Sequence, residues 1–241
     1  MSGFTWVGAP VDAVLVDLDG TMVDTMGDFV AALGMMLDEF SLPWVGRRTV
    51  ERLVGKGGEH LTRCVLEEAA RLVDQQADDA SGRPRARDSI DAMFPAALQA
   101  YRKHYHDVNG RYATVYPGVE TGLAQLRARG LALACVTNKP TSLAQPLLRD
   151  KGLDRYFSGI FGGDRFKQLK PDPTPLLVTC EALGSEPGRT LMIGDSSNDA
   201  EAARAAGCPV VLVTYGYNHG EPVGGLNVDG FVDSIAELEA C

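Results

Sequence analysis

Short β-rich hydrophobic runs alternate with helical patterns along most of the chain. Apolar runs predict buried strands over residues 11–16, 131–138, 190–195 and 209–216, with a weaker one at 157–164. Apolar residues at helical spacing predict helices over residues 119–129, 141–151, 173–183 and 198–206. Apolar strands that alternate with helices are typical of a parallel sheet covered on both faces. We therefore expect a doubly wound, Rossmann-like α/β domain.

One long segment breaks this alternation. Between residues 28 and 111, four stretches have helical periodicity and none has the pattern of a buried strand. A polar loop, residues 77–89, separates two of these stretches. We expect a core domain made of residues 1–27 and 112–241, and an all-α domain, residues 28–111, inserted after the first strand.

Composition narrows the classes of partner. The chain has 241 residues and a net charge of -9, which argues against a nucleic acid or an anionic membrane as partner. The five cysteines are widely spaced without a CxxC pair, as expected of thiols in a reducing cytosol. The sequence lacks the pattern of a signal peptide and any run of about 18 apolar residues, so we expect a cytoplasmic protein that does not span a membrane.

Polar residues follow the predicted strands at their C-terminal ends, where open parallel sheets bind ligands. These residues are Asp17, Asp19, Gly20, Thr137, Asn138, Asp195 and Asp199, together with Lys170 just before a helix that begins with proline. Taken alone, such residues have ordinary alternatives: Asp199, like Asp24, suits a helix cap or an organiser of hydrogen bonds, and Lys170 suits an exposed surface. Together they predict one site at one edge of the sheet.

The pair Asp17 and Asp19 points to a cation. In an extended segment, side chains two residues apart lie on the same side and would repel. Two like charges 4 Å apart cost about 4 kcal/mol at an effective dielectric constant near 20. Carboxylates of Asp17 and Asp195 with the backbone carbonyl of Asp19 form a hard-oxygen site that suits Mg²⁺. Lys170 would offset more of the negative charge.

Such a site also suits an anion. A phosphate group carries roughly -1.5 to -2 charge near neutral pH, so it needs the cation and the lysine beside the acids. Thr137 and the backbone N–H groups near Gly20 and Asn138 can hold its oxygens. Gly20 would let the backbone approach the ligand closely.

Four stretches, "DLDGTMVD", "VTNKP", "KPDP" and "GDSSND", resemble the ordered motifs of the haloacid dehalogenase-like hydrolase superfamily. The stretch "VTYGYNHGEP", residues 213–222, and the whole layout resemble its phosphoglycolate phosphatase family. The resemblance implies that the helical insert is a mobile cap. It also implies an enzyme, a phosphoric monoester hydrolase that uses Mg²⁺ and acts on a small phosphate ester, which we expect to be 2-phosphoglycolate.

The resemblance assigns a role to each motif residue. Asp17 is implied to be the nucleophile that becomes an aspartyl phosphate, and Asp19 the general acid and base. Thr137 is implied to bind the phosphoryl group and Lys170 to stabilise charge on its oxygens. Asp195 is implied to complete the metal site, with Asp199 orienting it from behind.

Other functions stay open from the sequence. A dehalogenase does not need the second acid, Asp19, whereas a phosphomutase shares every motif. A phosphatase of the same superfamily acting on pyrophosphate or a sugar phosphate also fits, as does a non-catalytic protein that binds a phosphorylated metabolite. For the non-catalytic protein, Asp19 has no chemical use. The sequence is equally consistent with a monomer and a homodimer.

Two loops remain without a firm role. The glycine-rich stretch "LVGKGGEH" carries Lys56, which is either a surface residue of a helix-to-helix turn or a contact to the substrate's carboxylate. Residues 215–221 are expected near the edge of the site, and no physical reason for their sequence is evident. His60, His104, His106 and His219 have no ligand-like spacing and are left unassigned.

Overall fold

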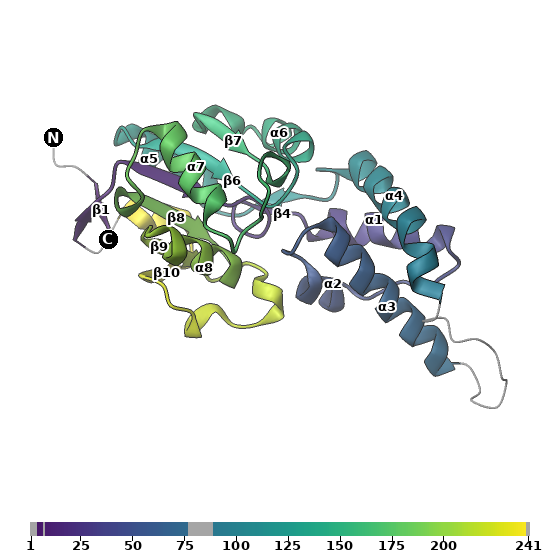
Figure 1. Cartoon of the computed structure of the whole chain (residues 1–241). Coiled ribbons are helices and arrows are strands. Elements are labelled where there is room, and N and C mark those ends of the chain that lie inside the picture. The colour runs from purple at the N-terminus through teal and green to yellow at the C-terminus, as the bar shows by residue number, and fades with distance from the viewer. Residues whose placement is uncertain (1–3, 7, 77–88, 240–241) are drawn as a thin grey trace. The chain divides into compact units, whose positions relative to one another are not determined.

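The computed structural model describes residues 4–6, 8–76 and 89–239 (Figure 1). The chain divides into two compact units, of which the first contains Met1–Asp24 and Thr114–Cys241 and the second Thr25–Ala113. Their assignment as core and cap stays a prediction. The polar loop expected over residues 77–89 lies, except for Ser89, outside the described residues, as does Cys241.

The first unit is built on a parallel sheet. Six strands, in the spatial order β10-β9-β8-β3-β6-β7, form it over the described residues. Their bounds are β3 Ala13–Val16, β6 Ala132–Val136, β7 Gly159–Phe161, β8 Thr190–Gly194, β9 Val210–Val213 and β10 Gly230–Val232. In the middle, Val16 of β3 pairs with Cys135 on one side and Ile193 on the other. This arrangement confirms the expected α/β fold.

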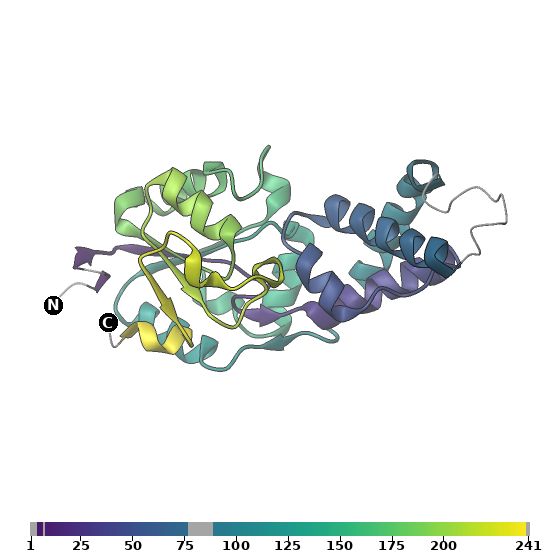
Figure 2. The same cartoon turned by 90° about the horizontal axis from the view of Figure 1, so that it is seen from below.

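Helices cover both faces of this sheet (Figure 2). Their bounds are α5 Val119–Ala128, α6 Thr141–Asp150, α7 Thr174–Leu183 and α8 Ser197–Ala206. Helices α7 and α8 pack on one face, where Leu15, Ala134 and Met192 share a buried cluster with their side chains. Helix α5 packs against β6 and η7 on the other face. All residues of β3 are buried, which explains why its sequence is continuously apolar.

Short elements complete the first unit. The 3₁₀ helices are η2 Asp154–Tyr156, η3 Gly163–Arg165, η4 Pro187–Arg189, η5 Asn218–Gly220, η6 Val223–Gly225 and η7 Ile235–Glu239. Two antiparallel pairs join β1 Thr5–Trp6 to β2 Ala9–Pro10, and β4 Val23–Asp24 to β5 Thr114–Val115. In the second pair, Val23 lies opposite Val115, so the segments where the chain leaves and re-enters this unit are hydrogen-bonded neighbours.

The second unit is helical over its described residues. Its helices are α1 Met26–Glu39, α2 Arg47–Leu53, α3 Gly58–Gln76 and α4 Ile90–Val108. Helix α4 packs against α1 and α3, and the rings of Phe29 and Tyr105 stack with centroids 5.0 Å apart. The fully buried Asp28 accepts hydrogen bonds from the backbone N–H groups of Gly110 at 2.7 Å and Tyr112 at 2.8 Å. This carboxylate therefore joins the start of α1 to the segment after α4.

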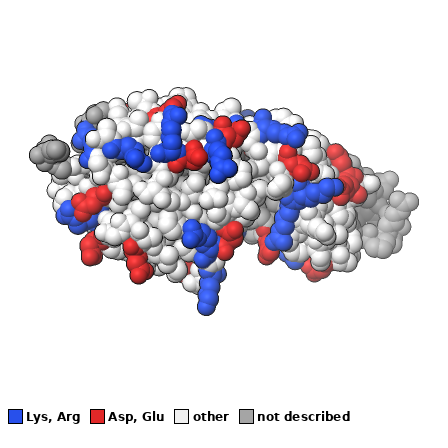
Figure 3. Space-filling model, turned by 90° about the horizontal axis from the view of Figure 1, so that it is seen from above, with Lys and Arg blue, Asp and Glu red and all other residues white. Residues whose placement is uncertain are grey.

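The face of the molecule shown in Figure 3 carries charges of both signs. On the face shown in Figure 3, acidic and basic side chains are interspersed among uncharged ones rather than gathered by sign. None of the described helices combines the length and hydropathy needed to cross a lipid bilayer.

We predict that Asp28→Ala lowers the free energy of unfolding by about 3 kcal/mol, because it leaves two buried backbone N–H groups without their charged acceptor. Urea unfolding followed by circular dichroism measures the loss. Asp107→Ala is the matched control, since the Asp107 side chain on α4 is 58% exposed. A loss at Asp28 no larger than that of the control would contradict this role.

Candidate active site

A tight turn after β3 carries the two acids. Asp17 is buried and follows the strand directly, and Asp19 is partly buried. The turn closes with the N–H of Gly20 donating to the carbonyl of Val23 at 2.9 Å. Gly20 has a φ of +88°, which glycine adopts without steric cost. A Cβ at this position would lie 2.3 Å from Oδ2 of Asp195, so glycine is also what lets the two strand ends approach each other.

Lys170 lies at the centre of the buried charges. Its Nζ is 2.8 Å from Oδ1 of Asp17, and it donates to Oδ1 of Asp199 at 2.6 Å and to the carbonyl of Val136 at 3.0 Å. Asn138 fixes its backbone, because the amide donates to the Lys170 carbonyl and accepts from its N–H, both at 2.9 Å. Burial lowers the pKa of Lys170, but the two carboxylates outweigh it and raise the pKa, so the side chain is charged.

Asp199 has two structural roles at once. Its Oδ2 accepts the N–H groups of Asp195 at 3.1 Å and Ser196 at 3.2 Å, and the Ser196 hydroxyl at 2.9 Å. The bond from the Ser196 N–H is one half of the capping box that begins α8, and in the other half the Ser196 side chain accepts the N–H of Asp199. Its Oδ1 accepts from Lys170. Both oxygens of Asp199 therefore have donors within the protein, which suits a positioning role better than direct contact with an ion.

Three carboxylates converge in this cluster. Asp17, Asp195 and Asp199 each offer an oxygen, and these oxygens lie within 4.8 Å of one another. Burial, with Asp199 and Asp19 adding and Lys170 opposing, raises the pKa of Asp17 to about 6. Burial and then Asp199 and Asp17 raise the pKa of Asp195 well above its ordinary value. One lysine does not balance three buried acids, and this oxygen donor set fits a hard divalent cation such as Mg²⁺.

The second acid of the pair has a lysine of its own. Nζ of Lys139 lies 3.1 Å from Oδ1 of Asp19, and the Lys139 side chain is only 3% exposed. The Lys139 N–H donates to Oγ1 of Thr137 at 3.2 Å, and the Thr137 N–H donates to the carbonyl of Phe161 at 3.0 Å. Two separate lysines therefore bind the two neighbouring acids, Lys170 on Asp17 and Lys139 on Asp19.

Comparison with known proteins identifies this arrangement. The model of the haloacid dehalogenase-like hydrolase family matches residues 14–213. The chain belongs to this family.

Similar members of the family cover almost the whole chain. A plasmid-encoded phosphoglycolate phosphatase of Cupriavidus necator is 44% identical over 97% of this chain and 94% of its own. The phosphoglycolate phosphatase of Escherichia coli K12 is 37% identical over 95% of this chain and 91% of its own. The crystal structure of a predicted phosphoglycolate phosphatase from Haemophilus somnus superposes with a TM-score of 0.85 at 30% identity, covering 95% of this chain and 97% of that one.

These comparisons confirm three expectations from the sequence. The resemblance to haloacid dehalogenase-like hydrolases and to their phosphoglycolate phosphatases is real, the fold is that of the family, and the chain is an enzyme of the phosphatase class. The roles of the individual residues stay predictions.

The structure brings most of the expected residues of this hydrolase together. At the C-terminal ends of β3, β6 and β8 it places Asp17, Asp19, Gly20, Thr137, Asn138 and Asp195. Asp199 lies in the first turn of α8, and Lys170 is bonded among them. The three carboxylates that could hold a metal ion include Asp199 and not Asp19. The expected contact between the backbone carbonyl of Asp19 and the metal stays a prediction. Lys56 is exposed in the loop between α2 and α3 of the second unit, and its contact to substrate also stays a prediction.

Sequence reasoning missed two parts of the site. One is Lys139, although it directly follows Asn138 in the quoted stretch "VTNKP". The other is the role of Tyr217, in the stretch expected near the edge of the site: its N–H donates to Oδ2 of Asp195 at 2.7 Å and its hydroxyl donates to Oδ1 of Asp24 at 2.7 Å. Asp24 is therefore a hydrogen-bond acceptor of Tyr217, and the N-cap of α1 is Thr25.

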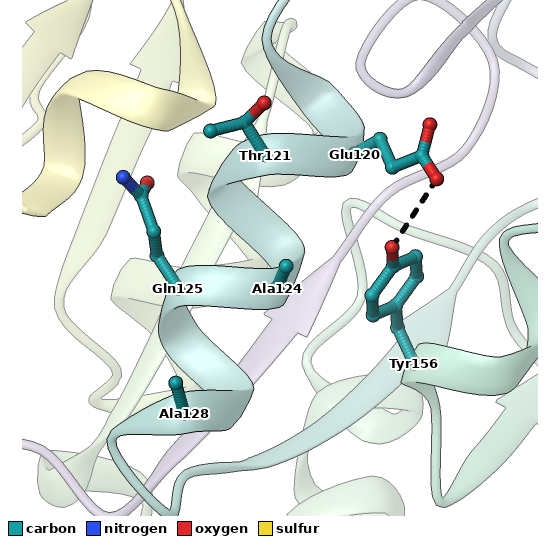
Figure 4. Close-up of a pocket in the computed structure, with 6 residues that line it drawn as sticks. All are labelled: Glu120, Thr121, Ala124, Gln125, Ala128 and Tyr156. Carbon is teal, nitrogen blue, oxygen red and sulfur yellow. Dashed lines mark hydrogen bonds between the residues drawn. The ribbon is translucent and has the colours of Figure 1, made fainter.

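A surface pocket on α5 is unrelated to this chemistry (Figure 4). It is lined by Glu120, Thr121, Ala124, Gln125, Ala128 and Tyr156, none of which belongs to the cluster of acids and lysines. The hydroxyl of Tyr156 donates to Glu120 at 3.4 Å between two of these lining residues.

We predict that Asp17→Asn stabilises the metal-free protein at pH 8 by about 2 kcal/mol, because the charged carboxylate of Asp17 is disfavoured in the fold. Since the pKa of Asp17 is raised to about 6, the native state takes up a proton as pH falls. The charged Asp17 destabilises the parent fully above pH 6. This destabilisation disappears as the pH falls towards the ordinary pKa of an aspartate, so the stability difference between the variant and the parent shrinks at low pH.

Urea unfolding of both proteins with EDTA, from pH 5 to pH 8, measures this difference. Asp150→Asn is the control, because the side chain of Asp150 on α6 is 63% exposed. The raised pKa of Asp17 would be contradicted if the variant were less stable than the parent at pH 8. It would also be contradicted if the variant were more stable by the same amount at every pH.

Proposed function

We propose that the protein is a Mg²⁺-dependent phosphatase that hydrolyses 2-phosphoglycolate to glycolate and phosphate through an aspartyl phosphate. One observation carries the proposal: Lys170 holds Asp17 beside Asp195 in a buried cluster, while Lys139 binds the adjacent Asp19 separately. The substrate is proposed from the curated relatives, which are named phosphoglycolate phosphatases and match over more than nine-tenths of both chains.

Asp17 is the proposed nucleophile. Its carboxylate oxygen forms a bond to phosphorus as the bond to the substrate's alkoxide oxygen breaks, which leaves an acyl phosphate on Asp17. The ammonium of Lys170, 2.8 Å from Asp17 Oδ1, stabilises the charge that this step brings together. Thr137 and the backbone N–H groups near Gly20 and Asn138 are proposed to bind the phosphoryl oxygens.

Asp19 is the proposed general acid and base. It gives its proton to the departing alkoxide, which leaves as the hydroxyl of glycolate. In the second step it takes a proton from water, and the hydroxide oxygen attacks phosphorus, releasing phosphate and restoring the Asp17 carboxylate. Asp19 therefore starts the cycle protonated and regains this proton from water, and Lys139, whose Nζ lies 3.1 Å from Oδ1, holds the carboxyl group beside the nucleophile throughout.

Asp17, Asp195 and the backbone carbonyl of Asp19 are the proposed ligands of Mg²⁺. Asp199 is proposed to orient these ligands without contacting the ion. A bound Mg²⁺ supplies positive charge that offsets the acids and the phosphate and polarises the phosphoryl group. The cluster of three buried acids around one lysine supports this proposal, because burial and neighbouring acids raise the pKa values of Asp17 and Asp195 and so disfavour their charged forms.

Two further proposals concern the location of the protein in the cell and its partners. The described cysteines, Cys64, Cys135, Cys180 and Cys208, are all free thiols, which supports a reducing, cytoplasmic location. We propose a small phosphate ester as the only kind of partner, with neither nucleic acid nor membrane, and a monomer or homodimer as the working form.

We predict Mg²⁺-dependent release of phosphate from 2-phosphoglycolate in preference to pyrophosphate, hexose phosphates and p-nitrophenyl phosphate. EDTA abolishes the release, and Asp17→Asn reduces kcat by about 10³-fold or more because the nucleophile is lost. Acid quenching with ³²P-labelled substrate leaves label on the parent protein and none on the variant.

Asp150→Asn retains parental activity as a control. Preference for another phosphate ester would overturn the substrate, transfer of the phosphoryl group to a second sugar position would indicate a phosphomutase, and phosphate binding without release would indicate a non-catalytic protein.

We predict that Lys56→Ala raises KM for 2-phosphoglycolate about tenfold with little change in kcat. This corresponds to a loss of about 1.4 kcal/mol of binding free energy that is equal in the substrate complex and in the transition state. The physical reason is the proposed contact between the Lys56 ammonium and the substrate's carboxylate. Lys103→Ala, at another exposed lysine of the same unit, is the control. If KM stays at the parental value, the glycine-rich loop is structural only.

A further inference from the structure

The segment made of residues 215–218, called here the 215–218 segment, contacts the site without belonging to any of its motifs. It follows β9, and its tyrosines and asparagine bond to two loops that are distant in sequence. Tyr217 donates its backbone N–H to Asp195, while Asn218 accepts the N–H of Ser197 on Oδ1 at 2.9 Å. The segment therefore holds the beginning of α8 together with the carboxylate that precedes it.

Asp195 is closely confined by this contact. Its Oδ2 accepts the N–H of Tyr217 at 2.7 Å, whereas the hydroxyl of Thr21 reaches Oδ1 at 3.4 Å. A Cβ on Gly216 would lie 2.1 Å from the Cβ of Asp195, and one on Gly20 would lie 2.3 Å from its Oδ2. Glycine on both sides and one short hydrogen bond therefore set the position and the rotation of this carboxylate.

The same segment holds the turn that carries the acid pair. The hydroxyl of Tyr215 donates to the carbonyl of Thr21 at 2.8 Å, and the hydroxyl of Tyr217 donates to Oδ1 of Asp24 at 2.7 Å. The ring of Tyr215 packs on Tyr116 with centroids 4.3 Å apart. These contacts connect the segment after β3 to the segment after β8, and each of those segments supplies an acid of the cluster.

We propose that the 215–218 segment is a positioning element that presets Asp195 and the turn after Asp19 for a divalent cation. The role of the cation rests on the proposed function. Ligand groups for Mg²⁺ must meet a narrow octahedral geometry, and supporting hydrogen bonds commonly set metal affinity by 10- to 100-fold. The segment supplies such bonds from its backbone through Tyr217 N–H and from its side chains through the two tyrosine hydroxyls.

The test measures binding of Mn²⁺ to the substrate-free protein by electron paramagnetic resonance. Gly216→Ala places a methyl group against Asp195 and is expected to raise the Kd for Mn²⁺ at least tenfold. Gly224→Ala is its control, since a Cβ at Gly224 meets nothing within 4 Å. Tyr217→Phe, which removes only the hydroxyl bonded to Asp24, is expected to raise the Kd severalfold, with Tyr156→Phe as its control.

A second readout separates positioning from a general loss of stability. Excess Mg²⁺ is expected to restore kcat of Tyr217→Phe to near the parental value, while its melting temperature without metal stays close to that of the parent. If Gly216→Ala fails to fold, Tyr217→Phe decides alone, because it adds no atom and keeps the backbone N–H. Mn²⁺ affinities within twofold of the parent for the folded variants would overturn the proposal.

The same experiment distinguishes this proposal from the proposed function. If the parent protein binds Mn²⁺ and the variants bind it more weakly, but 2-phosphoglycolate is not hydrolysed, the segment keeps its role and only the function is overturned. If the parent binds no Mn²⁺, both proposals are overturned.

Discussion

The buried ammonium of Lys170 is the interaction on which the site depends. Removing several carboxylates from water is costly unless a cation and hydrogen bonds compensate them. Lys170 binds Asp17, Asp199 and the carbonyl of Val136, so it joins the ends of β3 and β6 to the start of α8. Asn138 holds the lysine's backbone from both sides, which gives this ion pair a fixed position rather than the variable one of a surface lysine.

The single positive charge of Lys170 does not compensate all of the negative charge of the cluster. The pKa values of Asp17 and Asp195 are raised because burial and neighbouring acids disfavour their charged forms. A site in this condition gains free energy from any bound cation of suitable size, and a phosphate that accompanies the cation adds to the balance. Under the proposed function, the burial of these acids would lower the stability of the metal-free protein and raise its affinity for the cation.

Particular residues show what the sequence could reveal. Strands such as β3 were predictable because burial on both faces requires continuous apolar runs. Strand β10 was missed because it has three residues and exposes Phe231, so its run is too short to stand out. The motif residues of the site were predictable from strand ends. The hydrogen bond from Tyr217 to Asp24 spans 193 positions, and neither periodicity nor local spacing carries information about such a contact. Lys139 was missed for a simpler reason: a lysine after a strand usually lies in solvent, and only the fold reveals its burial.

The antiparallel pair of β4 and β5 has a consequence for how this protein can vary. Val23 and Val115 face each other, so excision of the helical insert between them would leave two chain ends only one strand spacing apart. A short reverse turn would close that gap without disturbing the sheet. Recombination could therefore exchange, enlarge or shorten the insert while the sheet and the cluster of acids and lysines at its strand ends stay unchanged.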